Sequence, residues 1–163
     1  MTLTSILPTL RHSIPSPFTR DLWPARAVPT LDDVIVAGVS ILRFVELCGT
    51  PCVTTGAAVL PISGGMASAT DSATILTMSV VAVDERTPTP VMVLDGVLGT
   101  VVPVWSEARL LGRISSARER RFTIRDADGR DLTGVTVILP GDLRAEDLVT
   151  VPCPGAHSVG EVR

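Results

Sequence analysis

The stretch from Leu139 to His157 (LPGDLRAEDLVTVPCPGAH) constrains the fold of this chain more than any other. Pro140–Gly141 is a strong turn signal, and the segment Leu148–Val151 that follows consists mostly of strand-forming residues. Such a stretch is typical of the last strand of a closed β-structure, where the chain brings polar side chains to one rim. We therefore expect Cys153 and His157 to lie just beyond that strand.

Composition favours a β-rich domain, because the chain of 163 residues is rich in Val, Leu, Ala, Thr, Gly and Pro and only 3% aromatic. This length is enough for one domain with a real core. The net charge of -3 gives no reason to expect nucleic acid or an anionic membrane surface as a partner. Three cysteines suit reduced thiols better than a disulfide framework. No apolar run resembles a signal peptide or a membrane span, so we expect a cytoplasmic protein.

The chain is expected to divide into an arm and one β-domain. Five prolines mark residues 1–30 as an arm that wraps the body, anchored by Phe18, Leu22 and Trp23. Residues 31–163 form the domain. Within it we expect a strand–helix–strand part at 31–60, a Gly/Ser-rich loop at 61–73 and the main strands at 74–157.

One short helix is predicted early in this domain. Ser40 is a good N-cap, Gly49 is a typical residue to end a helix, and the apolar residues between them follow helical spacing. Short extended runs separated by turns account for the rest: Asp32 to Ala37, Cys52 to Leu60, Thr74 to Asp84, Val91 to Asp95, Val101 to Trp105, Ala108 to Arg113, Arg118 to Arg125 and Val135 to Leu139. The pattern predicts a mainly β fold, a single closed or nearly closed β-barrel with one or two short helices and a Pro-rich N-terminal arm.

Two pairs of residues have the spacing of zinc ligands. Cys48 and Cys52 are separated by three residues, as are Cys153 and His157, and together the four could form a tetrahedral Cys3His site. The alternative is that the cysteines are small buried hydrophobes, which is the commoner role of free cysteine.

Two separated stretches resemble a known family. Leu31 to Val53 (LDDVIVAGVSILRFVELCGTPCV) is similar to the N-terminal signature of pyridoxal-phosphate (PLP)-dependent amino-acid decarboxylases of the alanine-racemase fold type, most of all to diaminopimelate decarboxylase. Thr74 to His157 resembles the C-terminal β-barrel of that family, with Val93 to Gly96 in place of its V-D-G-G motif and a closing GAH in place of its GAY. The resemblance covers about 100 residues. It implies that the strand Asp33 to Ala37 pairs within the same barrel.

The family's cofactor-binding part has no counterpart here. The (β/α)8 barrel that holds PLP needs about 250 residues, whereas residues 53–73 alone join the two matching stretches. The chain has no lysine for a Schiff base, since all 14 basic residues are arginine. The family's C-[DE]-S-G-D motif aligns with Ala127 to Asp131, its GAY tyrosine with His157, and the second Gly of V-D-G-G with Val97. The resemblance therefore implies no PLP chemistry, and we expect no bound cofactor.

Three functions follow from this resemblance and from the residues. The chain could be a decarboxylase-like pseudoenzyme that serves as a non-catalytic partner, dimerisation or regulatory protein of a PLP-dependent decarboxylase. It could be a cofactor-independent small-molecule biosynthetic enzyme, with the barrel rim as a pocket lined by His157, Asp131 and Cys153, since a histidine beside a carboxylate can move protons. It could also be a structural zinc module.

Self-association is expected as well, because a barrel without its cofactor domain leaves an apolar face that a homodimer would cover. If the rim is a pocket, His157 should point inward toward Asp131, Cys153 or a ligand. If the protein is a passive partner, we expect this ring in solvent on a frayed tail, because none of the six residues after it promises a strong anchor.

Overall fold

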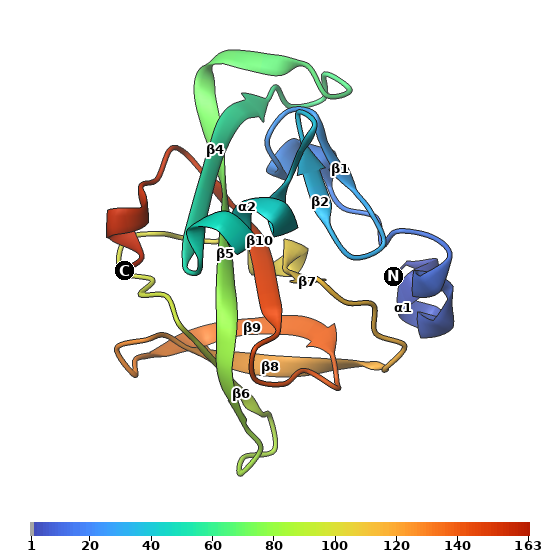
Figure 1. Ribbon diagram of the computed structural model, residues 1–163, viewed down its shortest axis with the longest axis vertical. Helices are drawn as coiled ribbons and strands as arrows, with labels where there is room; N and C mark the ends of the chain where they lie inside the picture. The colour runs from blue at the N-terminus through green and yellow to red at the C-terminus, as the bar shows by residue number, and fades with distance from the viewer. Residues whose placement is uncertain (1) are drawn as a thin grey trace.

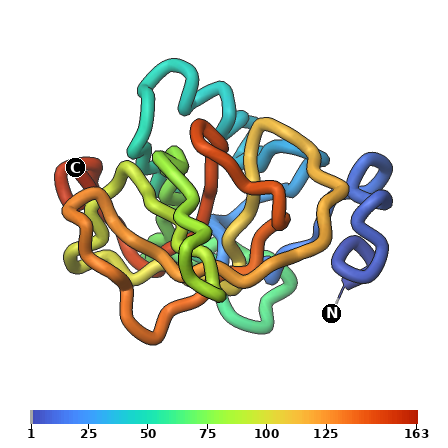
Figure 2. The backbone as a smooth tube through the Cα atoms, turned by 90° about the horizontal axis from the view of Figure 1, so that it is seen from below, coloured from blue at the N-terminus to red at the C-terminus, as the bar shows by residue number. Residues whose placement is uncertain are grey.

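The computed structural model describes residues 2–163 and confirms a mainly β fold. Its helical elements are α1 (Leu3–Ile6), η1 (Pro8–His12), η2 (Arg20–Leu22), α2 (Ile41–Cys48), η3 (Trp105–Glu107) and η4 (Val159–Glu161). Its strands are β1 (Ala27–Pro29), β2 (Val34–Val36), β3 (Val39–Ser40), β4 (Cys52–Val59), β5 (Ala67–Asp84), β6 (Val91–Leu94), β7 (Arg109–Leu111), β8 (Glu119–Arg125), β9 (Asp131–Pro140) and β10 (Leu148–Pro154). The N-terminal helical turns and the C-terminal turn η4 lie on opposite sides of the molecule (Figures 1 and 2).

The larger of two sheets is built around β5, which is 18 residues long and visible as the vertical strand in Figure 1. The strand order is β7-β10-β5-β6-β8-β9, and β4 also pairs with the first part of β5. A bulge between Val80 and Ala82 lets β5 bend from β4 and β10 toward β6. The sheet curls into a half-barrel (Figure 2), but β7 and β9 at its two ends do not pair, so the barrel is not fully closed.

The prediction that Asp33 to Ala37 pairs within this barrel is wrong. Strand β2 lies in a separate three-stranded sheet between β1 and β3, with Ala27 opposite Val36. The reason is that the Pro-rich arm itself supplies β1, whose backbone groups satisfy one edge of β2. The arm is thus not a simple wrapping segment, since its end is a strand of this small sheet.

Strand β5 separates two apolar cores because its side chains alternate between the two faces of the sheet. On one face Leu76, Met78 and Val80 join the core of the half-barrel. On the other face Ile75 joins a second core that contains apolar residues of β1, β2, α2 and the arm. Both faces of the strand are buried at this point, which explains why residues 73–78 read as an almost continuous apolar and threonine run.

The helix prediction is confirmed in detail. The Ser40 hydroxyl accepts a hydrogen bond from the Arg43 amide, and α2 ends at Gly49, which has the positive φ of 74° that glycine adopts without strain. Ile41 and Val45 are buried toward the second core, one turn apart. Asp33 fixes the start of the helix, because its carboxylate accepts from the Ser40 hydroxyl and the Leu42 amide.

Two other predicted boundaries are wrong. The loop expected at 61–73 is shorter, because β5 begins at Ala67 and pairs with β4 through its small polar residues. These residues are mostly exposed on both faces, so their sequence lacks the alternation of apolar and polar residues that would have predicted a strand. The run Val101 to Trp105 is irregular and leads into η3 rather than forming a strand.

Trp23 is the main anchor of the arm. Its side chain is fully buried, its ring stacks on Phe18 with centroids 4.9 Å apart, and its Nε1 donates to Glu107 Oε2 over 2.9 Å. Leu22, also expected as an anchor, is instead 36% exposed. The C-terminal end is anchored too, because Val162 is buried in the half-barrel core and its carbonyl accepts from the Val97 amide. The expectation of a frayed tail is therefore wrong.

Candidate functional site

Three segments of the chain meet at one end of the half-barrel. In the turn between β8 and β9, the amide of Ala127 donates to the carbonyl of Gly96 over 3.1 Å. The next residue after that glycine, Val97, donates to the carbonyl of Val162 over 2.9 Å. The end of β6, the β8–β9 turn and the C-terminal turn are thus held together by backbone hydrogen bonds.

An apolar groove of about 410 Å³ opens beside this end, and we call it the rim groove. Its walls come from the loop after β6 and from the start of β9. The side chains on its walls are mainly apolar: Leu98, Val101, Val102, Pro103, Trp105, Leu132 and Val135. Gly99, Thr133, Arg130 and Asp131 complete the lining. Leu98, Val101, Pro103 and Trp105 are buried, and Val102 at the edge is 76% exposed. An exposed apolar side chain on an apolar groove with a charged edge is a feature of docking sites.

Both charged residues of the rim groove are paired within the turn. Arg125 donates to Asp131 through Nε and Nη2, at 2.6 and 3.1 Å, and these bonds lower the pKa of the Asp131 carboxyl. Arg130 Nη2 lies 3.3 Å from Oδ2 of the buried Asp126, without the alignment of a hydrogen bond. The other oxygen of Asp126 accepts from two amides of the same turn. These charges shape the turn and leave no carboxylate positioned as a free base.

His157 does not meet Asp131 or Cys153. Its Nε2 lies 3.0 Å from the Pro154 carbonyl, and its Nδ1 lies 3.4 Å from Glu161 Oε1. Glu161 also accepts from the amide and hydroxyl of Ser158, which closes a capping box on η4. The half-buried ring is therefore part of the C-terminal turn, neither directed into a pocket nor free in solvent.

Cys153 is fully buried in the half-barrel core, and it does not line the rim groove. Burial raises the pKa of its thiol to about 12. Because the thiolate is the reactive form, this cysteine is unsuited to nucleophilic chemistry at neutral pH. The three predicted catalytic candidates thus lie in three different environments.

The zinc hypothesis is not supported by the geometry. Within residues 2–163 no group of three or more His, Cys, Asp or Glu side chains is placed to hold a metal ion. Cys48 is exposed at the end of α2, Cys52 is buried in β4, and Cys153 lies in the half-barrel core. The matching spacings arise from a helix end and a strand end that the fold does not bring together.

Thiol reactivity gives a direct test of this arrangement. In the native protein we expect one fast reaction with a disulfide reagent at pH 8, at Cys48, because it alone of the cysteines is exposed. Burial, and to a smaller extent the nearby Cys48, raises the pKa of Cys52 to about 11. Cys52 and Cys153 should react only on unfolding. The Cys48→Ser variant should lose the fast phase, and a second fast thiol in the native protein would contradict the structure.

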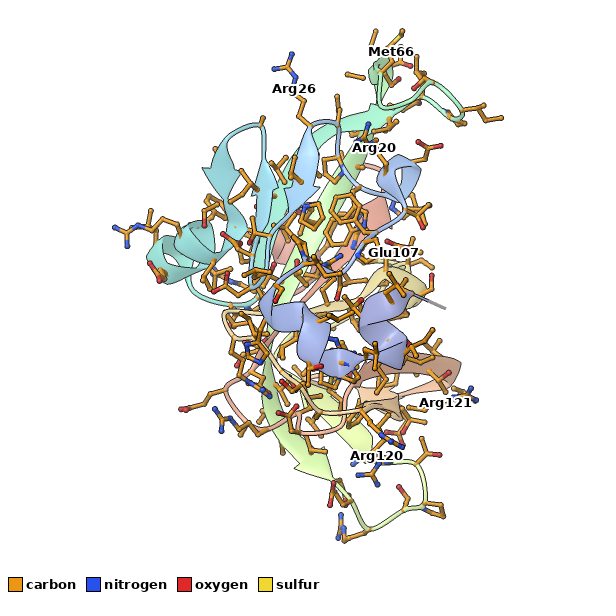
Figure 3. All side chains as sticks on the ribbon, turned by 90° about the vertical axis from the view of Figure 1, so that its right-hand side faces the viewer. Arg20, Arg26, Met66, Glu107, Arg120 and Arg121 are labelled. Carbon is orange, nitrogen blue, oxygen red and sulfur yellow. The ribbon has the colours of Figure 1, made fainter. Side chains whose placement is uncertain are left out.

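A second cavity, of about 600 Å³, has no signal in the sequence, and we call it the arm cavity. It lies between the N-terminal arm and the strands β7 to β9, and its lining includes Arg11, Glu107, Arg109, Arg113 and Glu119. Figure 3 looks onto this side of the molecule, with Glu107 above the N-terminal helical turns and Arg120 and Arg121 below them. Its residues are about 100 positions apart in the chain, and no local pattern links them.

No protein-family model matches this chain, and no curated protein matches it either. Among the helices of residues 2–163, none combines the length and apolar character that a membrane crossing requires.

Proposed function

We propose that this protein is a non-catalytic interaction module, which docks through the rim groove on a PLP-dependent amino-acid decarboxylase. The observation that carries the proposal is the contrast at the rim. The polar candidates Asp131, His157 and Cys153 are paired or buried, whereas Val102 is 76% exposed at the edge of an apolar groove. Polar groups that are already paired, next to an exposed apolar side chain, favour association over chemistry.

The resemblance supports the choice of partner. The rim groove lies beside the turn and the strand end that align with the family's motifs, and decarboxylases of this family pack their own barrels against one another. A chain that keeps this barrel but lacks the cofactor domain would fit as a substitute for one such contact. Self-association through the same face stays a prediction, as does a cytoplasmic location.

The alternative of a cofactor-independent enzyme at the rim is less well supported. It requires His157 to face a pocket together with a carboxylate or a thiol. His157 contacts Glu161 instead, but that carboxylate is engaged by Ser158, and neither residue lines the rim groove.

The decisive experiment mixes the purified protein with the diaminopimelate decarboxylase of the same organism and measures complex mass by light scattering and affinity by calorimetry. We expect a defined complex that Val102→Arg weakens by about tenfold or more, because it places a charge in an apolar contact. Val81→Arg is the matched control, since Val81 is 55% exposed on β5 and lies outside the rim groove.

Failure to form any complex at micromolar concentrations would refute the proposal. Equal weakening by both variants would place the contact elsewhere and refute the assignment to the rim groove. Since both valines are exposed, neither substitution should impair folding, which circular dichroism would verify.

A further inference from the structure

The arm cavity has the dimensions and wall chemistry of a small-molecule site. Its volume of about 600 Å³ falls within the range of ligand pockets. Six hydroxyl-bearing residues contribute to its lining: Thr2, Thr4, Ser5, Ser16, Ser106 and Ser115. Three of these hydroxyls already form a chain, because Thr4 Oγ1 lies 3.1 Å from Thr2 Oγ1 and 3.2 Å from Ser16 Oγ. Such a wall is preorganised for a hydroxylated ligand.

Most of the charged groups on the walls are already neutralised. Arg11 is buried and pairs with Glu119 over 2.9 Å, and its other donors meet the carbonyls of Ser115 and Ala117. Arg113 donates through Nε and Nη2 to Asp147, at 2.6 Å in each case. These pairs fix the walls and leave little charge for a ligand.

Arg109 differs from every other arginine that the structure describes. Ion pairs join Arg11, Arg43, Arg86, Arg113, Arg120, Arg125, Arg130 and Arg144 to carboxylates. The remaining arginines have no such pair within residues 2–163: Arg20, Arg26, Arg109, Arg118, Arg121 and Arg163. Of these six, all except Arg109 are exposed to solvent. A half-buried guanidinium without a carboxylate is therefore a specific feature of the arm cavity.

The contacts of Arg109 fix its position without neutralising its charge. Its Nη atoms donate to the carbonyls of Ser16 and Pro17, and its guanidinium carbon lies 5.5 Å from the centre of the Phe18 ring. A guanidinium has five N–H donors, so donors remain beyond these two bonds. Burial lowers the pKa of Arg109 to about 10, with Glu107 partly opposing the effect, and the side chain is still charged at neutral pH.

We infer that the arm cavity binds a small hydroxylated monocarboxylate, with Arg109 as the anchor of its carboxylate and the hydroxyl wall as the partner of its hydroxyl groups. Carboxylate oxygens match the geometry of a guanidinium and form strong charge-assisted hydrogen bonds with it. Glu107 also lines the cavity and has no ion pair within residues 2–163, so a phosphate dianion or a polycarboxylate would meet repulsion there.

Gluconate is a suitable probe, with glucose as the neutral counterpart of similar size and inorganic phosphate as the competing anion. We expect gluconate to give saturable shifts of the Arg109 Nε–Hε signal in 1H–15N spectra and to raise Tm with concentration. Glucose should give neither effect. No saturable shift with gluconate, glycerate or acetate at tens of millimolar, or saturable binding of phosphate alone, would overturn the inference.

Two sets of variants locate the site. Arg109→Gln should weaken gluconate binding by about tenfold or more, whereas Arg121→Gln should leave it unchanged, because Arg121 projects outward from β8 in Figure 3 and does not line the cavity. If Arg109→Gln fails to fold, the exposed Ile138 at the cavity edge provides a second test. Ile138→Lys adds a positive charge at the cavity and should tighten binding of the carboxylate, whereas Ile138→Glu adds a negative charge and should weaken it. Equal affinities in all these variants would refute the assignment.

This inference does not rest on the proposed docking function, because the arm cavity and the rim groove share no lining residue. Val102→Arg should leave gluconate binding intact, and Arg109→Gln should leave a decarboxylase complex intact. The two proposals can therefore fail separately.

Discussion

Replacing Trp23 by alanine should lower the free energy of unfolding by about 3–5 kcal/mol, which is the range for removing a large buried aromatic side chain. The indole is fully buried in the second core, stacks on Phe18 and donates to Glu107. Its loss leaves a cavity and an arm without its anchor, and Glu107 Oε2 keeps only the hydrogen bond from the Thr19 amide. Urea denaturation with a linear extrapolation would measure the effect, with Trp105 as the remaining fluorophore.

Leu22→Ala is the matched control for this measurement. Leu22 is the neighbouring residue in the arm, but it is 36% exposed and belongs to neither core. Its truncation should cost about 1 kcal/mol or less. If Trp23→Ala were no more destabilising than this control, the assignment of Trp23 as the anchor would be wrong.

The second large effect is expected at Asp147. Its side chain is only 5% exposed and accepts two hydrogen bonds from Arg113, and its Oδ2 also accepts from the Arg144 amide over 2.9 Å. The bonds from Asp147 raise the pKa of Arg113 above its usual value, so Asp147→Ala would leave a charged and poorly solvated guanidinium. We expect a loss of about 2–4 kcal/mol, because Asp142 still contacts Arg113 and offsets part of the cost.

Asp131→Ala provides the comparison, since Asp131 makes the same kind of paired contact with Arg125. That pair is exposed to solvent, and exposed ion pairs contribute little to stability. The denaturation midpoint should therefore move clearly for Asp147→Ala and hardly at all for Asp131→Ala. Similar shifts in both variants would show that burial is not the deciding factor.

Elements whose signals are local could be predicted from the sequence. Ser40 and Gly49 define α2 because an N-cap hydroxyl and a residue with positive φ act on their immediate neighbours. The strand formers at the end of the chain gave β10, although it extends to Pro154, three residues beyond the expected end. These assignments require no knowledge of what packs against the segment.

Elements that depend on distant partners could not be predicted. Nothing near Ala67 to Ala73 indicates a strand, since these residues become one by pairing with β4. The partner of β2 is likewise decided by the arm, because β1 occupies the edge that the barrel was expected to fill. The burial of Val162 could not be predicted either, because a single valine near the end of a chain is buried only if the folded core offers a place for it.

The candidate site followed the same division. The sequence grouped His157, Asp131 and Cys153 as one site, and the structure places the three in different environments. It could not show that His157 would be engaged by Glu161 or that Arg109 would lie against the arm. Such contacts depend on the orientation of side chains, which spacing along the chain does not determine.

The two-sided burial of β5 limits how this chain can be divided. A shortened version that begins at Cys52 would keep every strand of the half-barrel, but it would lose β1, β2, α2 and Trp23. The face of β5 that carries Ile75 would then be exposed as a flat apolar surface, which favours aggregation. Versions of the protein intended for binding studies or fusions should therefore retain the N-terminal segment, with any tag attached ahead of it or after Arg163.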